Sequence, residues 1–290
     1  MGTDHPALTF DEFYYAHNCG RPYGRDPEWL DFFGGIADRI VKDIRPRRVL
    51  DAGCAIGLLV EALRARGVEA DGIDVSEYAL SHTADAVRPY CRLGSLVSSF
   101  ETRYDLVVCM EVLEHMPSAD AVAAIANICL HTDDVLFSSS PHDYGEATHV
   151  NVRAPEDWAE AFARHGFVRD LDFDAAFVTP WAVRFRRREE PLHRLVKEYE
   201  RAFARVSLER SELRAQVLQW DRQVQVEAAE APRLRAALAL ANEQLLSSQH
   251  ALAQAHDRIN HMERSRFWKL RAWWVTWRAL LGMDNADPPR

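Results

Sequence analysis

The stretch VLDAGCAIG (49–57) decides the fold of this chain. It begins as a short apolar run that ends in Asp51, and Gly53 and Gly57 follow in a turn. A strand followed by Asp-x-Gly-x-x-x-Gly can bend sharply against a bound ligand, because glycine has no Cβ to clash there. Asp74 follows 23 residues after Asp51, at the expected end of the next strand. In a doubly wound sheet, that position brings a carboxylate to the ribose hydroxyls of a nucleoside ligand.

The same loop excludes two other classes of nucleotide site. A dinucleotide-binding loop has the pattern GxGxxG, and a P-loop ends in GKS or GKT, whereas this loop reads DAGCAIG. Asp51 beside the loop also disfavours a pyrophosphate, because the two charges repel. A ligand with a cationic amino-acid portion fits better.

Strand-like and helix-like stretches alternate around this loop. Five apolar runs predict strands, at 47–52, 70–75, 90–94, 104–111 and 133–140. Helical patterns predict helices over 58–67, 76–87, 119–130 and 154–167. The segments FVRDLDF (167–173) and FVTPWAVRFRRR (177–188) predict two closing strands, with an antiparallel strand at one edge. The expected fold is α/β, a Rossmann-like, doubly wound, seven-stranded sheet over residues 46–190.

Three motifs together resemble those of the class I S-adenosylmethionine-dependent methyltransferases over about 46–188. They are VLDAGCAIG, GIDVS (72–76) and YDLVVCMEVLEHMP (104–117). The resemblance implies S-adenosylmethionine as cofactor, with Asp51 facing its amino group and Asp74 its ribose. The rest of the implied site comprises Ala52, Gly53, Cys54, Ala55, Gly57, Val75, Ser95, Leu96, Cys109, Met110 and Glu111. Many relatives have Gly-Asp-Ala where this chain has 94–96, so Ser95 or a backbone group must hold the adenine amino group.

Methyl transfer to a hydroxyl needs an aligned acceptor and a group that takes its proton. We expect His149 or His115 to be that base, because both follow strands of the sheet and histidine titrates near neutrality. His142 and Asp143 are weaker candidates, and a purely structural role is the alternative for His115. The residues Glu111, His115, Asp143 and His149 can also hold a divalent cation. Since no tight ligand spacing recurs, we expect no metal.

Residues 1–45 predict an N-terminal helical lid, with aromatic-rich helices at 10–15 and 27–44. The pattern YY–CGRPY–W–FF resembles a group of bacterial methyltransferases encoded with glycosyltransferases for surface polysaccharides. It implies that Tyr14, Tyr15, Tyr23 and Trp29 cover the cofactor and acceptor, although Trp29 can equally pack onto the sheet. The implied reaction is O-methylation of a sugar or glycan intermediate in polysaccharide biosynthesis. The alternatives are another small-molecule or lipid-precursor acceptor, or a cofactor-binding scaffold that organises a glycan-assembly complex.

A heptad repeat occupies residues 191–264. Apolar residues fill most a positions from Val196 to Ile259 and most d positions from Leu192 to Met262. This pattern predicts a long α-helical coiled coil and a homo-oligomer, with a lone surface helix or hairpin as the alternative. Pro232 predicts a kink or a join between two helices.

The segment 265–290 is an aromatic and basic tail. Four of its residues are tryptophans, Trp268, Trp273, Trp274 and Trp277, and arginines and a lysine lie near them in the sequence. Tryptophan with basic residues on an amphipathic segment suits a membrane interface. The alternative is packing onto the coiled coil or onto a protein partner such as a glycosyltransferase.

Charge and cysteine content limit the partners and the cellular compartment that we expect. The formal charge is −13 over 1–190 and +4 over 191–290, which together give −9. The acidic first part excludes nucleic acid as the main partner. Five cysteines without CxxC spacing suggest neither a disulfide framework nor a zinc site. With no signal-peptide pattern and no apolar run of about 20 residues, we expect a cytoplasmic protein, free or peripheral to the inner face of the membrane.

Overall fold

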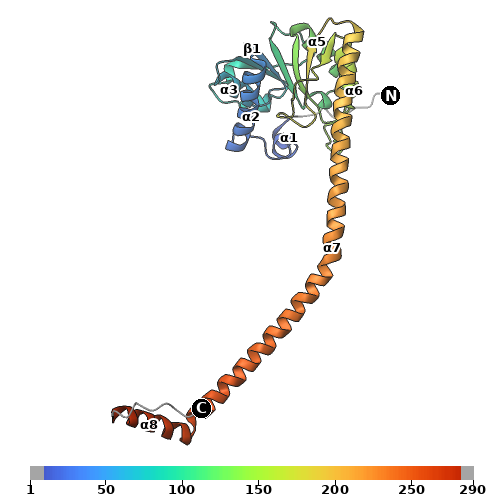
Figure 1. Ribbon diagram of the computed structural model, residues 1–290. Helices are drawn as coiled ribbons and strands as arrows, with labels where there is room; N and C mark the ends of the chain where they lie inside the picture. The colour runs from blue at the N-terminus through green and yellow to red at the C-terminus, as the bar shows by residue number, and fades with distance from the viewer. Residues whose placement is uncertain (1–9, 282–290) are drawn as a thin grey trace. The chain divides into compact units, whose positions relative to one another are not determined.

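The chain divides into two units, and the boundary in the sequence follows Phe203. A seven-stranded sheet forms the centre of the first unit. The computed structural model describes residues 10–281. In chain order the strands are β1 (Arg48–Ala52), β2 (Glu69–Asp74), β3 (Cys91–Leu93), β4 (Leu106–Met110), β5 (Asp134–Ser138), β6 (Phe167–Arg169) and β7 (Val183–Arg187). They lie in the order β3-β2-β1-β4-β5-β7-β6. Figure 1 shows the sheet between the helices of the first unit, with β1 labelled. The expected seven-stranded, doubly wound sheet is confirmed, and the strand order reverses between β1 and β4.

The antiparallel strand does not lie at the edge, so that part of the prediction is wrong. β7 pairs antiparallel with both β5 and β6, which leaves β6 as the edge strand. The reason is burial: Phe185 of β7 is almost fully buried opposite Val135 of β5. β6 has only three residues and buries Phe167 alone, so it can occupy the outside. The Arg184 guanidinium also pairs with the Asp134 carboxylate across β5 and β7.

Helices cover both faces of the sheet. They are α1 (Glu12–His17), α2 (Pro27–Arg39), α3 (Leu58–Arg64), α4 (Glu77–Ser81), α5 (Ser118–His131) and α6 (Pro155–Ala163), with short helices η1 (Ile40–Ile44), η2 (Arg88–Tyr90) and η3 (Leu113–His115). One core includes buried residues of α2 and α3, and the other includes those of α5 and α6. Val108 belongs to the first core, whereas its neighbours Val107 and Cys109 belong to the second, as the two-residue period of a strand requires.

Local hydrogen bonds fix where α2 begins and where α4 ends. Asp26 caps α2 by accepting hydrogen bonds from the Glu28 and Trp29 backbone amides. α2 then widens into the π-helical turn η1, so together they span the expected helix 27–44. α4 stops at Ser81, six residues before the expected end. The Ser81 hydroxyl and the His82 ring both contact the Tyr78 carbonyl, which competes with continuation of the helix.

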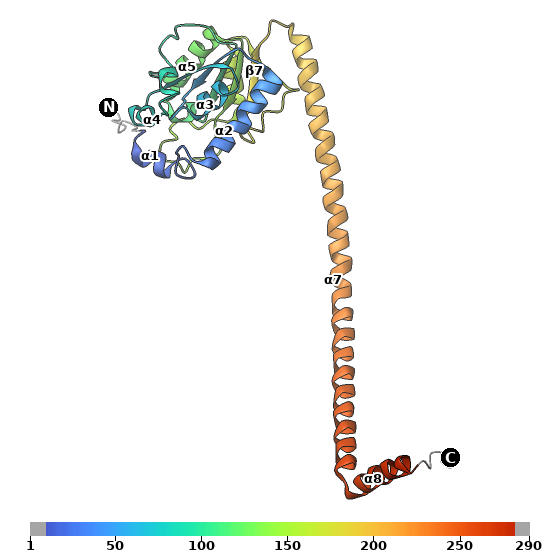
Figure 2. The same ribbon diagram turned by 90° about the vertical axis from the view of Figure 1, so that its left-hand side faces the viewer.

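The second unit is helical. α7 (Leu192–Arg264) starts in the first unit and contains no buried residue, and α8 (Arg266–Leu280) follows it. Figure 2 shows α7 as one unbroken helix, which confirms the long helix. Pro232 lies inside it, so the expected join between two helices is not formed. Within residues 10–281, no helix is both long and apolar enough to cross a membrane. Residues 1–9 of the expected lid and 282–290 of the expected tail lie outside the described residues.

Candidate active site

The glycine loop after β1 adopts a backbone that needs its small residues. Gly53 has a φ of +92°, and a Cβ there would lie 2.3 Å from Cγ2 of Val112. Ala55 has a φ of +46°. A non-glycine residue in this region costs of the order of 1–3 kcal/mol, and such strain persists where the surrounding structure enforces it. The loop is therefore held in one conformation before any ligand arrives.

Asp74 is the residue that holds the loop. Its Oδ2 atom accepts a hydrogen bond from the Ala55 backbone amide, and Oδ1 accepts one from the Ser76 amide, both at 2.8 Å. Burial raises the pKa of Asp74, while these backbone hydrogen bonds lower it. Each carboxylate oxygen retains a lone pair, so Asp74 can still accept hydrogen bonds from ligand hydroxyls.

Asp51, at the end of β1, is a buried carboxyl group that no described residue neutralises. Only 4% of its surface is exposed. Burial and the nearby charge of Asp74 raise the pKa of Asp51 to about 8. A buried carboxylate costs free energy unless a cation pairs with it. The position therefore suits the positively charged amino group of a ligand, which agrees with the role expected from the sequence.

These residues open onto a cavity of about 590 Å³, a size usual for small-molecule sites. Of the expected cofactor residues, the following line it: Asp51, Gly53, Cys54, Ala55, Asp74, Val75, Ser95, Leu96, Met110 and Glu111. Both expected bases, His115 and His149, line the same cavity, as does Asp143. The structure thus brings segments from the carboxyl ends of β1, β2, β3, β4 and β5 to one site.

Three expected site residues do not line the cavity. The Cys109 side chain is fully buried in the core under α5, because strand alternation turns it away from the ligand side of β4. Ala52 belongs to the same core for the same reason. Gly57 caps α3 with a φ of +77°, and a Cβ there would lie 2.9 Å from Cys91 Sγ. Its role is to let the chain turn from the loop into α3.

A chain of hydrogen bonds holds His115 in the lining of the cavity. Its Nδ1 atom lies 2.9 Å from the Thr148 hydroxyl, and that hydroxyl donates to the Glu146 carboxylate at 2.8 Å. Because the Thr148 proton is already used, Nδ1 must carry the proton and Nε2 is left unprotonated. Nε2 lies 3.4 Å from the Tyr14 hydroxyl. Burial and the neighbouring His149 lower the pKa of His115 to about 4.

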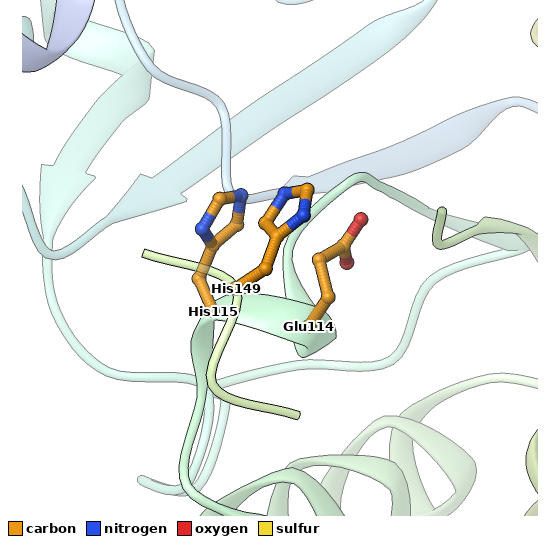
Figure 3. A group of neighbouring side chains, drawn as sticks. All are labelled: Glu114, His115 and His149. Carbon is orange, nitrogen blue, oxygen red and sulfur yellow. The ribbon is translucent and has the colours of Figure 1, made fainter. Parts of the chain in front are cut away.

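His149 and Glu114 complete this end of the site (Figure 3). The rings of His115 and His149 lie 4.6 Å apart at their centroids. The His149 Nδ1 atom lies 2.8 Å from the Asp143 carbonyl oxygen, so it donates there and leaves Nε2 unprotonated. Glu114 is fully buried, and burial together with the charge of Glu111 raises its pKa to about 8. Its Oε1 atom accepts a hydrogen bond from the Ser140 amide at 3.0 Å.

Glu111 and Trp181 form a contact that the sequence did not suggest. Glu111 has a φ of +52°, and its Oε1 atom accepts a hydrogen bond from the Trp181 indole at 2.9 Å. Trp181 lies in the link before β7, 70 residues further along the chain. It also lines the cavity. No local pattern marks Trp181, because its position depends on how β7 inserts into the sheet.

The N-terminal helices supply an aromatic wall. Tyr14, Tyr15, Tyr23 and Trp29 all line the cavity. Trp29 also packs on the core that contains α2 and α3, as its alternative packing role requires, and its role in covering the cofactor and acceptor stays a prediction. The Tyr15 and Tyr78 rings stack with centroids 5.8 Å apart. These contacts attach the aromatic wall to the sheet domain.

Residues 26–171 match a family described as the methyltransferase domain. The match covers half of the chain. The chain belongs to this family. The methyltransferase domain thus contains Asp51, Asp74 and both cavity histidines. The match agrees with the enzyme class expected from the sequence, a methyltransferase.

Curated relatives of this methyltransferase domain include ubiquinone biosynthesis O-methyltransferases. The protein from Alkalilimnicola ehrlichii is 38% identical over 102 residues, which are 32% of this chain and 41% of that protein. The protein from Neisseria meningitidis serogroup C is 33% identical over 140 residues, 44% of this chain and 57% of that protein. The chain spans about half the length of the curated relatives it matches.

Solved structures similar to the methyltransferase domain share little sequence with it. Magnesium protoporphyrin IX methyltransferase from Synechocystis, with bound S-adenosylmethionine, is 18% identical with a TM-score of 0.48 and is covered over its full length by 63% of this chain. CalS10, an amino pentose methyltransferase from Micromonospora echinaspora, is also 18% identical, with a TM-score of 0.45 and the same coverage of both chains.

Proposed function

We propose that this chain transfers a methyl group from S-adenosylmethionine to a hydroxyl group of a small molecule. The observation that carries the proposal is the single cavity, which joins the Asp51–Asp74 loop to the His115–His149 pair. One end of the cavity offers carboxylates to a cationic ligand, and the other offers unprotonated imidazole nitrogens. A methyl donor and a hydroxyl acceptor need these two environments side by side.

The donor end fits S-adenosylmethionine through groups that are already in place. Asp51 would pair with the amino group of the methionine portion, and Asp74 would accept hydrogen bonds from the ribose hydroxyls. Val75 and Leu96 would pack on the adenine, with Ser95 near its amino group. Met110 and Glu111 would lie near the sulfur. When bound, the cofactor supplies a methyl group on a positively charged sulfur, so the protein has mainly to align the acceptor with it.

The acceptor end is formed by His115, His149 and the aromatic wall. We place the acceptor hydroxyl against the Nε2 atoms, which can take its proton directly. Tyr14 lies over His115, and Met116 and Val178 also line the cavity. Together with the N-terminal helices, these side chains would cover the acceptor, as the lid expected from the sequence requires. Apolar and aromatic neighbours suit an acceptor with an apolar or ring-shaped body.

The choice of acceptor class follows from the relatives. The curated relatives are named for ubiquinone biosynthesis, which favours the alternative of another small molecule or lipid precursor over the sugar or glycan acceptor implied by the N-terminal resemblance. The same names support oxygen as the methylated atom. Polysaccharide biosynthesis therefore becomes the second choice for this site.

Methyl transfer is the direct test. The full-length chain is incubated with S-adenosylmethionine carrying a labelled methyl group and with hydroxylated aromatic compounds or hydroxylated sugars. We expect label on an aromatic hydroxyl, and His142→Ala should behave as wild type because His142 is exposed and lines no part of the cavity. Label found only on sugars would instead support a sugar or glycan acceptor. Cofactor binding without transfer to either class would favour the scaffold alternative.

We further propose that α7 associates with α7 of a second copy of the chain. Its a and d side chains are exposed in the single chain: Val217, Leu238 and Leu245 each expose more than half of their surface. A helix of 73 residues with no buried side chain is not stabilised by its own unit. A heptad seam on another copy would bury those residues.

For α8 we propose attachment to an anionic membrane surface. Residues 265–281 contain three arginines and one lysine but no acidic residue. The Trp273 and Trp277 rings stack 6.1 Å apart and both side chains are more than half exposed. Exposed indoles beside basic groups favour the headgroup region of anionic lipid. This attachment would place a cytoplasmic enzyme at the inner face of the membrane.

A further inference from the structure

We propose that Glu114, His115 and His149 bind a divalent transition-metal cation at the acceptor end of the cavity. These three side chains each offer a ligand atom, and the three atoms lie within 4.8 Å of one another (Figure 3). Ligands around one cation at about 2.1 Å stand roughly 3.4 Å apart in a tetrahedral site. Small side-chain rotations are therefore enough to close the site.

The donor set selects the kind of metal. Two imidazole nitrogens and one carboxylate are the ligands of catalytic zinc sites, which keep a further position open. Imidazole also suits other first-row transition metals, whereas Mg²⁺ and Ca²⁺ prefer oxygen donors. His115 and His149 line the cavity, so the open position would face the acceptor.

Both histidines are oriented as metal ligands usually are. A ligating histidine usually donates its second ring N–H to a backbone carbonyl, a carboxylate or water, and a hydroxyl oxygen can accept in the same way, which fixes the tautomer. His149 donates from Nδ1 to the Asp143 carbonyl, and His115 donates from Nδ1 to the Thr148 hydroxyl. Each ring keeps Nε2 for a cation. The Tyr14 hydroxyl lies 3.4 Å from the His115 Nε2, a long contact that a cation can displace.

Glu114 provides the second, independent observation. Its side chain is fully buried beside the Glu111 carboxyl, and no donor within residues 10–281 gives a hydrogen bond to its Oε2 atom. Leaving a buried carboxyl oxygen without a hydrogen-bond donor lowers the stability of the folded protein, because water no longer satisfies that oxygen. A cation beside Oε2 would remove that cost. The Ser140 amide holds Oε1, so only Oε2 is left to face the metal.

This site differs from the four-residue cluster weighed from the sequence. The Oε1 atom of Glu111 accepts a hydrogen bond from the Trp181 indole, and the Glu111 carboxyl also contacts Glu114. The Asp143 carboxylate stands 3.7 Å from the His149 Nδ1 rather than at Nε2. Glu114 replaces both because η3 turns it inward beside His115.

The cation would also explain how the acceptor hydroxyl is activated. This catalytic role rests on the proposed methyltransferase function, whereas binding of the cation does not. An acceptor hydroxyl bound at the open position would lose its proton more readily, because a bound divalent cation lowers the pKa of a coordinated oxygen. The proton would leave to water, and the resulting oxygen anion would take the methyl group from sulfur. In this arrangement the two imidazoles are ligands, and the metal replaces them as the group that activates the acceptor.

Metal binding is tested with Co²⁺, whose visible absorption reports nitrogen coordination. The full-length chain, without a histidine tag and stripped with a chelator, is titrated with Co²⁺, and Zn²⁺ is then added as competitor. We expect one equivalent per chain and displacement by Zn²⁺. His149→Ala and Glu114→Gln should weaken binding by at least about tenfold, and Thr148→Val by about tenfold through the orientation of His115. His142→Ala is the control and should bind as wild type.

A second measurement distinguishes a variant that is misfolded from one that is folded but has lost the metal site. S-adenosylmethionine binding to each variant, followed by calorimetry, should stay within about twofold of wild type. Absence of a stoichiometric Co²⁺ site in wild type, or a site unaffected by His149→Ala and Glu114→Gln in variants that still bind cofactor, would overturn the metal proposal. Full methyl transfer in the presence of chelator would overturn its role in activating the acceptor and leave the methyltransferase function standing.

Discussion

The Nδ1 atom of His115 stands 2.9 Å from the Thr148 hydroxyl, which in turn donates to Glu146. This relationship directs the unprotonated Nε2 of His115 into the cavity, whether it meets a hydroxyl proton or a cation. Thr148 and Glu146 are therefore positioning residues. Both belong to the segment after β5, far from His115 in the sequence.

Thr148→Val should lower the turnover number with little change in cofactor affinity. The variant removes the acceptor for the His115 Nδ1 proton, so the ring can adopt the wrong tautomer. We expect a loss of about 10- to 100-fold in kcat. Thr148→Ser keeps the hydroxyl and should restore most of the rate. Equal rates for the Val variant and wild type would show that the hydrogen bond does not position His115.

Asp51 should make the cofactor-free protein less stable as the pH rises. Its pKa is about 8 in the folded protein and about 4 in an unfolded chain. The folded state therefore holds a proton that the unfolded state releases between these values. The stability from this proton is fully present below pH 4 and is lost as the pH rises through 8.

Asp51→Asn should remove this pH dependence. Between pH 5 and pH 8, the Tm of wild type should fall relative to that of Asp51→Asn. The corresponding loss of unfolding free energy is at most about 1.4 kcal/mol per pH unit. Asp85→Asn is the matched control, since Asp85 is 93% exposed and should follow wild type. Parallel Tm profiles for wild type and Asp51→Asn would contradict the raised pKa.

Self-association through α7 should depend on the heptad seam rather than on leucine content. Leu238→Lys/Leu245→Lys changes two a positions and should reduce the mass measured by light scattering to that of one chain. Leu240→Lys/Leu246→Lys changes two neighbouring leucines outside the seam, with similar exposure, and should leave the oligomer intact. If both pairs of substitutions have the same effect, the seam is not the interface.

Because of α8, the protein should co-sediment with anionic vesicles. Trp273→Ala/Trp274→Ala/Trp277→Ala should remove co-sedimentation, because the indoles supply most of the apolar surface that enters the headgroup region. Leu218→Ala, which changes an exposed leucine of α7 outside the heptad seam, is the control. Binding should weaken at high salt and on neutral vesicles. Undiminished sedimentation of the triple variant would point to a protein partner instead.

The backbone of the cofactor loop was predictable because its chemistry is local. The spacing of Asp51, Gly53 and Asp74 predicts both the turn and the two carboxylates at the ends of adjacent strands. Cys109 was assigned to the wrong side because a run of apolar residues such as LVVCM does not show which of them face the ligand. Both faces of β4 are buried, so no alternation is visible.

Other parts of the site depend on distant segments. Glu114 becomes a buried carboxyl group only because the chain after β5 returns over η3: the Ser140 amide meets its side chain, and the Asn151 amide meets its carbonyl. Trp181 reaches Glu111 only because β7 inserts between β5 and β6. These contacts follow from tertiary packing, which the residue pattern of one sequence does not specify.

The most direct test of the account is the binding of S-adenosylmethionine to the full-length chain, measured by calorimetry for wild type and for Asp74→Ala. Asp74 is proposed to hold the cofactor ribose, and it also holds the Ala55 amide of the glycine loop. Wild type should bind one cofactor per chain, and Asp74→Ala should show no measurable binding while keeping its circular dichroism spectrum. Asp85→Ala should bind as wild type. Unchanged affinity in a folded Asp74→Ala protein would contradict the assignment of the cofactor site.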